Sequence, residues 1–340
     1  MGLRHSVIAI AILIVVVVFS SRSVSRGAVY RYRTARMNYG WKADFAFSQL
    51  LVEAARSAGE CADPLLSTTL PLIDPPASSA SVAASGRGSG RQAVIVGGAN
   101  EGGLVRLFAR DCPGLRVTGL EIQASLLQRV KSRFDTERSS FPNVQMLHMG
   151  MSDAEGEASF AGGDEGSEIS SIMDPRDAER KRFADWEIAP YKVKVLPLPF
   201  IYKRHVSPST LFYVVIDVEG HEPLVIRGMN LSDVAEQRRF PAFQFEVGGT
   251  WAIRDPRHPR GSWSLPEVAE HLTNHRYELF LIGERDLLRV DPGFFSPGVG
   301  ADIDEGFGPI LSPGNVLALR REFAHPAVVT LVDSLTYRTL

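Results

Sequence analysis

The chain has 340 residues, of which 44% are hydrophobic and 22% are charged, and its formal net charge is −2. This composition is typical of a globular protein with room for one large domain and appendages, and the small net charge gives no reason to expect a nucleic-acid partner. Only two cysteines occur, Cys61 and Cys112. We therefore expect neither a disulfide framework nor a cysteine metal cluster.

The N-terminal segment contains an uninterrupted apolar run, Val7–Phe19. Its length suits a signal-peptide core or a short signal anchor. Because Ser20-Ser21 is a poor cleavage site, we expect residues 1–24 to form a retained single-pass membrane anchor, which would place the protein in the secretory pathway. Two orientations of the anchor are compatible with the sequence. The arginines after the run favour a domain on the cytoplasmic side, whereas a long folded domain after a short anchor often lies on the lumenal side.

Three further segments follow the anchor. Residues 25–91 are interpreted as a stem with one helix within 37–60, ending in a Ser/Gly/Ala-rich linker that cannot bury a core. The folded domain is expected over residues 92–322, and residues 323–340 would form a C-terminal tail.

The folded domain begins with a strand that breaks into a glycine-rich loop, Ala93–Gly103. Gly98 and Gly102 allow a tight turn and a close approach of the backbone to a ligand. Leu104, Leu107 and Phe108 then follow at helical spacing. Strand, glycine loop and helix form the first unit of a nucleotide-type binding fold, although such a loop can also be a simple turn.

The second predicted strand, Arg116–Ile122, contains Glu121 near its end, 121 − 98 = 23 residues after Gly98. An acid about 20 residues after the glycine loop holds ribose hydroxyls in Rossmann-type sites. The alternative is a solvated glutamate at a strand end. Together, loop and acid predict a Rossmann-like site for a ligand that carries ribose.

The third predicted strand is Val144–Met149, and Asp153 follows it at the same edge of the sheet. Asp153 could contact a base or cap a turn. Glu155–Ala189 is polar and irregular, as expected of a lid, a binding loop or disorder. Tyr191–Leu198 alternates weakly and is compatible with an extra strand.

The strongest apolar run after the N-terminus, Leu211–Val218, predicts a central buried strand. It ends in Asp217, Glu219, His221 and Glu222, and ionisable groups at such a place are costly without partners or a ligand. The alternative is that His221 and Glu222 only cap the following helix. Later predicted elements complete an alternating α/β pattern typical of a doubly wound sheet: strands Phe243–Val247, Tyr277–Ile282 and Asn315–Arg320, and helix Leu265–Leu272.

Several of these motifs, in this order, resemble the FkbM-type methyltransferase family over residues 92–322. The family's Asp-x-Gly-Ala-Asn-x-Gly stretch is matched by Gly98-Ala99-Asn100-Glu101-Gly102, and the acid ending its second strand is matched by Glu121. Its most specific stretch is matched by Asp217-Val218-Glu219-Gly220-His221-Glu222 and Gly228. The remaining matches are Asn143-Val144, Ser152-Asp153, Gly156, Ser170-Ser171 and Glu246. One departure is Val96, which stands where the family has its first-strand Asp; the apolar pair Val215-Ile216 also replaces a polar residue.

The resemblance implies a class I methyltransferase fold: a Rossmann-like, doubly wound, mostly parallel seven-stranded sheet that binds S-adenosylmethionine. Gly98, Asn100 and Gly102 would hold the amino-acid end of this cofactor, Glu121 its ribose and Asp153 its adenine side. Catalytic candidates are Asp217, Glu219 and His221, with His221 or Asp217 as the base. Asp217 and Glu246 could together hold a divalent ion, but no His-rich ligand spacing supports one, so no metal is expected. The reaction would be O-methylation of a hydroxyl on a small-molecule or glycan acceptor.

Three other functions fit parts of the chain. A membrane-tethered, non-catalytic binding protein on this fold is suggested by Val96. An anchored glycosyltransferase would use Asp217-Val218-Glu219 as a metal and nucleotide-sugar motif, but leaves the glycine loop and Glu121 unexplained. A nicotinamide oxidoreductase would fit Gly97-x-Ala99-x-x-Gly102, but nothing downstream supplies its chemistry. Asn230-Leu231-Ser232 is a glycosylation acceptor sequence if the domain is lumenal.

Overall fold

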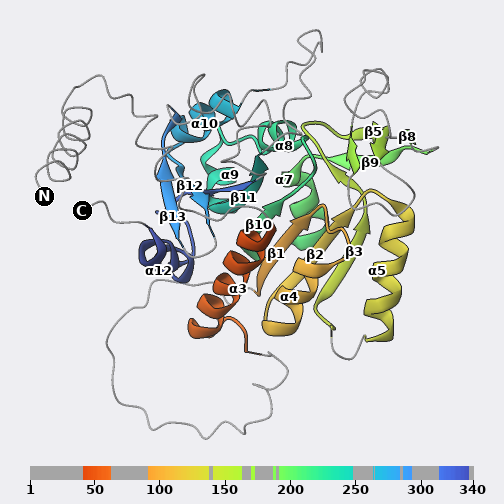
Figure 1. The fold of residues 1–340 in the computed structure, drawn as a ribbon, viewed down its shortest axis with the longest axis horizontal. Helices are drawn as coiled ribbons and strands as arrows, with labels where there is room; N and C mark the ends of the chain where they lie inside the picture. Colours follow the sequence, from red (N-terminus) through yellow and green to blue (C-terminus); the bar gives the residue numbers. More distant parts are fainter. Residues whose placement is uncertain are drawn as a thin grey trace, which may run out of the picture.

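The computed structural model is organised around one large mixed sheet with helices on both faces (Figure 1). It describes residues 41–62, 91–137, 141–162, 170–172, 187–188, 191–247, 263, 265–283, 286–292 and 314–336. The predicted anchor and most of the predicted stem lie outside these residues. Within the described part of the chain, no helix is both long and apolar enough to span a membrane.

The main sheet has the strand order β3-β2-β1-β10-β11-β14-β12-β13. Strands β3, β2, β1, β10 and β11 pair in parallel, and β14 runs antiparallel to both β11 and β12. The strand bounds are β1 Gln92–Gly97, β2 Arg116–Glu121, β3 Val144–His148, β10 Thr210–Ile216, β11 Ala242–Val247, β12 Glu278–Ile282, β13 Leu287–Val290 and β14 Gly314–Leu319. The Rossmann-like doubly wound sheet is thus confirmed, with eight strands instead of seven because β13 extends its edge.

Both faces of the sheet are buried, which explains the continuous apolar runs of its central strands. In β1, Val94 and Val96 point into one apolar core, and Ala93 and Ile95 point into the other. Side chains of α3 Trp41–Ser57, α4 Gly103–Asp111, α5 Ala124–Thr136 and α12 Pro326–Leu335 fill the first core. Those of α7 Leu198–Ile201, α8 Glu222–Gly228 and α10 Leu265–Asn274 fill the second.

Helix α3 belongs to the packed domain, although the sequence analysis placed it in the stem. It lies beside α4 and α12, and Phe47, Leu51 and Ala55 on one face of it are at most 1% exposed (Figure 1). A disulfide bond joins Cys61, just after α3, to Cys112 at the end of α4. This corrects the expectation that the cysteines would form no framework, because the fold brings together two residues that are 51 positions apart.

Helix α12 falls within the segment predicted as a C-terminal tail. Val328 and Val332 of this helix are fully buried in the core that α3 also enters. The His325 side chain caps α12 by accepting the Ala327 N–H, and its Nε2 lies 3.0 Å from Glu60 Oε1 near the end of α3. The two ends of the described chain therefore pack on each other. The end of the predicted anchor at residue 24 stays a prediction.

The polar segment after β3 contains short strands that the sequence analysis did not foresee. They are β4 Gly150–Met151, β5 Gly156–Ala158, β6 Phe160–Gly162, β7 Ser170–Ile172 and β8 Glu187–Ile188. The extra strand expected near Tyr191–Leu198 is confirmed as β9 Val193–Leu196, which pairs with β4 and β5. The remaining described helical segments are η2 Tyr202–Val206 and α9 Val234–Arg239.

The role of α3 can be tested with two phenylalanines of the same helix. Phe47 is 1% exposed and Phe45 is 38% exposed. Because Phe47→Ala leaves a cavity in the core, we expect it to lower the free energy of unfolding by about 3–5 kcal/mol, with Phe45→Ala changing it by less than about 1 kcal/mol. Urea denaturation measures both. Equal, small effects would show that α3 is not part of the cooperative domain.

Candidate functional site

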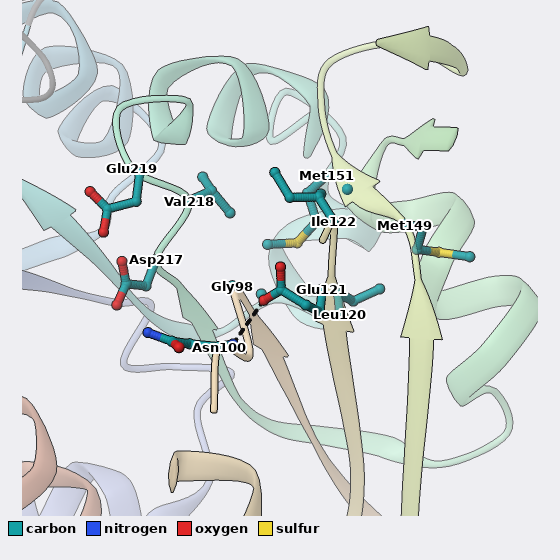
Figure 2. Close-up of a pocket in the computed structure, with 12 residues that line it drawn as sticks. Gly98, Asn100, Leu120, Glu121, Ile122, Met149, Met151, Asp217, Val218 and Glu219 are labelled. Atoms are coloured by element: carbon teal, nitrogen blue, oxygen red, sulfur yellow. Dashed lines mark hydrogen bonds between the residues drawn. The ribbon is translucent and has the colours of Figure 1, made fainter. Parts of the chain in front are cut away.

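A cavity opens at the carboxyl ends of β1, β2 and β10 (Figure 2). The chain runs from β1 outward to β2 and β3 and later returns to the other side of β1 with β10, and such a switch point is where open α/β sheets bind ligands. The cavity holds about 530 Å³ of empty space, which includes space open to solvent. Its lining residues are Gly97, Gly98, Asn100, Leu120, Glu121, Ile122, Met149, Gly150, Met151, Asp217, Val218 and Glu219.

The glycine loop after β1 is wedged against the chain that leaves β10. Gly98 has φ +70°, and a Cβ atom there would lie 1.7 Å from the carbonyl oxygen of Asp217. The Asp217 N–H donates to the Gly97 carbonyl oxygen at 3.1 Å, and the Ala99 N–H donates to that of Leu120 at 2.8 Å. Only glycine combines this φ with this contact, so the loop backbone itself forms one wall of the cavity.

Glu121 holds the loop from the side of β2. Its Oε2 accepts the Asn100 N–H at 2.9 Å and its Oε1 accepts the Gln123 N–H at 2.9 Å (Figure 2 shows the first of these bonds). Glu121 is 4% exposed, so the alternative of a solvated glutamate is excluded. Burial raises the pKa of this carboxyl, although the backbone N–H groups of Gln123, Asn100 and Ile122 favour its charged form. A carboxylate has about four lone-pair sites, so Glu121 can still accept a hydrogen bond from a ligand that enters the cavity.

Val96, the departure from the family pattern, does not face the cavity. Its side chain is 1% exposed and packs in the apolar core shared with α3 and α4. The N–H groups of the loop have other acceptors. The Asn100 N–H donates to the Glu121 carboxylate, and the Glu101 N–H donates to the Asn100 Oδ1 at 2.6 Å. The loop is therefore stabilised without an acid at position 96.

The loop after β10 brings acidic groups to the opposite side of the cavity. Asp217 and Glu219 line the cavity, and Glu219 has φ +54°. Glu222 does not line it: the residue is fully buried, and its two carboxylate oxygens accept the N–H groups of Val218 at 2.8 Å and Gly220 at 2.9 Å. The Glu222 side chain therefore fixes the shape of the loop that presents the other two acids.

These acids affect one another's ionisation. Burial, with the nearby charge of Glu121, raises the pKa of Asp217 to about 6. Burial, with the charge of Asp217, raises the pKa of Glu219 to about 7, and burial raises the pKa of Glu222 to about 8. Oxygens of Asp217, Glu219 and Glu246 lie within 4.8 Å of one another. Such a cluster favours a cationic ligand, because positive charge offsets the mutual repulsion of the carboxylates.

Three predicted site residues do not line the cavity. His221 is 8% exposed, and its Nε2 lies 3.1 Å from the Ser152 Oγ. Asp153 forms an ion pair with Arg227 and accepts a hydrogen bond from Ser152 at 3.2 Å. Their side chains thus hold the turn after β4 against α8, which is a structural role that the motif pattern did not reveal.

Gly102 is the third of these residues and precedes α4 with φ +80°. A Cβ atom there would lie 2.9 Å from Val130 Cγ1, so this glycine lets α4 and α5 approach each other.

No sequence motif indicated the apolar side of the cavity. Ile122, Met149 and Met151 lie on the side of β2 and β4, across from the acids of the β10 loop (Figure 2). Their place in the chain could have predicted this wall, because each of these three residues follows or ends a strand at the ligand-binding edge. A cavity with one apolar wall and one acidic wall suits a ligand with a flat apolar part and a positive charge.

No protein-family model matches the chain, and no curated protein matches it. Solved structures do match, at low similarity. Methyltransferase FkbM from Methylobacillus flagellatus KT is 12% identical with a TM-score of 0.37, over 66% of this chain and 42% of its own. Cofactor-bound Rv0187 from MTB is 10% identical with a TM-score of 0.37, over 91% and 96% of the two chains.

Fibrillarin from Aeropyrum pernix, with natively bound S-adenosyl-L-methionine, is 11% identical with a TM-score of 0.30, over 68% of this chain and 66% of its own. This chain thus spans 42% of the length of the FkbM protein it matches. Likenesses at this level assign no activity to the chain.

The close contact between Gly98 and the Asp217 carbonyl can be tested by comparing Gly98 with Gly103, a second glycine of the same segment. A Cβ atom at Gly103 would meet nothing within 4 Å. We expect Gly98→Ala to lower the free energy of unfolding by about 2 kcal/mol or more, because it combines backbone strain with a clash. Gly103→Ala, at the start of a helix, should be neutral or stabilising by up to about 1 kcal/mol. Urea denaturation measures the free energy of unfolding of both variants. An unchanged value for Gly98→Ala would contradict the described conformation of the loop.

Proposed function

We propose that the protein is an S-adenosylmethionine-dependent methyltransferase that methylates a hydroxyl oxygen of a small-molecule or glycan acceptor. The observation that carries this proposal is the pairing of two features in one cavity. Glu121 and the glycine loop offer a site for a ribose-bearing ligand, and Asp217 and Glu219 offer negative charge across from it. A nucleoside ligand that also carries a positive charge satisfies both.

The residues present fit this cofactor part by part. Glu121 keeps lone pairs that can accept the ribose hydroxyls, and the loop from Gly98 to Asn100 is positioned for the amino-acid end. Ile122, Met149 and Met151 offer an apolar surface for adenine. Asp153 was expected on the adenine side, and its ion pair with Arg227 makes the apolar surface the better candidate.

S-adenosylmethionine supplies a methyl group on a sulfonium, so the protein's main task is to align the acceptor oxygen and to remove its proton. Asp217 and Glu219 are the candidates for the base, because both line the cavity and their pKa values of about 6 and 7 suit proton acceptance near neutral pH. His221, the other candidate base, is engaged with Ser152 outside the cavity lining, which favours the two acids.

The site also bears on the membrane-tethered, non-catalytic alternative. That alternative was motivated by Val96, and the loop is held by Glu121 and Asn100 without an acid at position 96. We keep the N-terminal anchor and residence in the secretory pathway as part of the proposal, supported by the apolar run Val7–Phe19.

Calorimetric titration of the purified full chain tests the proposal. We expect S-adenosylmethionine and S-adenosylhomocysteine to bind, and NAD and a UDP-sugar with Mn²⁺ not to bind. Glu121→Ala should weaken both adenosyl ligands by about tenfold or more, because it removes the ribose contact and one support of the loop. Glu157→Ala, at an exposed position, is the matched control.

The outcomes separate the alternatives. Binding of NAD alone or of the UDP-sugar alone would overturn the proposal. Binding of the adenosyl ligands without methyl transfer to any hydroxyl acceptor would favour the non-catalytic protein.

The acidic wall predicts a pH effect that distinguishes the two adenosyl ligands. Asp217 and Glu219 are neutral below their raised pKa values and become charged as pH rises through about 6 to 7. Charged carboxylates attract the sulfonium of S-adenosylmethionine and not the neutral thioether of S-adenosylhomocysteine. The ratio of the two dissociation constants should therefore shift in favour of S-adenosylmethionine by about tenfold between roughly pH 5 and pH 8.

Calorimetry at both pH values measures this ratio. Asp217→Asn should reduce the shift, and Glu157→Gln should leave it unchanged. A ratio independent of pH in the wild-type chain would mean that the acids do not face the sulfonium.

A further inference from the structure

The turn between α8 and α9 carries the one Asn-x-Ser/Thr sequence of the chain, Asn230-Leu231-Ser232. Asn230 and Ser232 are exposed, whereas Leu231 between them is 1% exposed and anchors the turn in the core. The Asp233 N–H donates to the Asn230 carbonyl oxygen at 3.0 Å, which closes the turn. The acceptor sequence is therefore displayed on a firmly held surface turn.

The side chains of this turn are arranged around the Asn230 amide. The Ser232 Oγ donates to the Asn230 Oδ1 at 3.0 Å. Among the described residues, none accepts a hydrogen bond from the Asn230 Nδ2, and Asn230 itself is exposed. Val234, also in this region, is 51% exposed, and Asn230 is not among the residues that line the cavity. A bulky group on Asn230 fits the surface without entering the site.

An independent observation concerns the compartment in which the domain folds. Cys61 and Cys112 form a disulfide, and both are buried, at 9% and 0% exposure. Protein disulfides of this structural kind form and persist in oxidising compartments and are rare where thiols are kept reduced. The disulfide thus supports the lumenal orientation, one of the two that the N-terminal segment left open.

We propose that Asn230 is an N-glycosylation site and that the folded domain lies on the lumenal side of the membrane. The co-reactant is a sugar joined through its anomeric carbon to a lipid pyrophosphate. The Asn230 Nδ2 forms a bond to that carbon and gives up one proton, while the bond from the carbon to the pyrophosphate oxygen breaks and the lipid pyrophosphate leaves with the electron pair. The glycan then covers the exposed turn beside Val234.

The test expresses the full chain in cultured eukaryotic cells and treats it with peptide N-glycosidase. We expect one heavier species that collapses on a denaturing gel to the position of the unglycosylated chain. Peptide mass spectrometry of the released chain should show Asn230 converted to Asp. Asn230→Gln and Ser232→Ala should abolish the heavier species. Ser232→Thr should retain it, and Asn274→Gln, at an exposed asparagine outside the acceptor sequence, should leave it unchanged.

Thermal melting of the deglycosylated wild type and the variants shows that each variant folds. A folded wild-type chain with the Cys61–Cys112 disulfide formed and Asn230 unmodified would contradict the proposal that Asn230 is glycosylated. An unmodified chain with both thiols reduced would overturn the glycan and the lumenal orientation together. None of these readouts depends on cofactor binding, so this proposal and the methyltransferase proposal fail separately.

Discussion

The close packing of the glycine loop against the chain leaving β10 is the constraint on which the site depends. The absent side chain of Gly98 lets the loop lie on the Asp217 carbonyl, and Glu121 ties the loop to β2 from the other side. Three strands thereby share one junction at the switch point of the sheet. Because the loop is held by backbone contacts on both sides, its position does not rely on the acid that the family pattern places at Val96.

The electrostatics of the cavity follow from the same junction. Bringing the ends of β2 and β10 together also brings Glu121 near Asp217, where burial and then the charge of Glu121 raise the pKa of Asp217. Glu222 holds the neighbouring loop with both of its oxygens, so the acids cannot move apart without breaking those bonds. A positive charge in the cavity relieves this repulsion, which makes the acidic wall a selective feature and not merely a cost.

Much of the fold could be predicted from the sequence, because buried parallel strands leave strong apolar runs. The runs at Ala93–Val96 and Leu211–Val218 predicted β1 and β10. The spacing from Gly98 to Glu121 predicted a Rossmann-like site at the ends of the first two strands. Chain position, however, does not give side-chain direction. His221 follows β10 as predicted, yet its ring turns to Ser152, a partner 69 residues away that no local pattern reveals.

The membership of α3 in the domain could not be predicted for a related reason. The spacing of Phe47, Leu51 and Ala55 gives a helix an apolar face, but it does not say what covers that face. The low-complexity linker before Gln92 favoured a separate stem, whereas the Cys61–Cys112 disulfide and the contacts with α12 hold the helix on the sheet. Long-range pairings of this kind depend on the completed fold.

A crystal structure of the full chain with S-adenosylhomocysteine is the most direct test of the central claim. The account predicts the ribose hydroxyls on the Glu121 carboxylate, the amino-acid end at the loop of Gly98 and Asn100, and the thioether sulfur facing Asp217 and Glu219. A ligand bound elsewhere, or one lying in the cavity with its ribose away from Glu121, would contradict it.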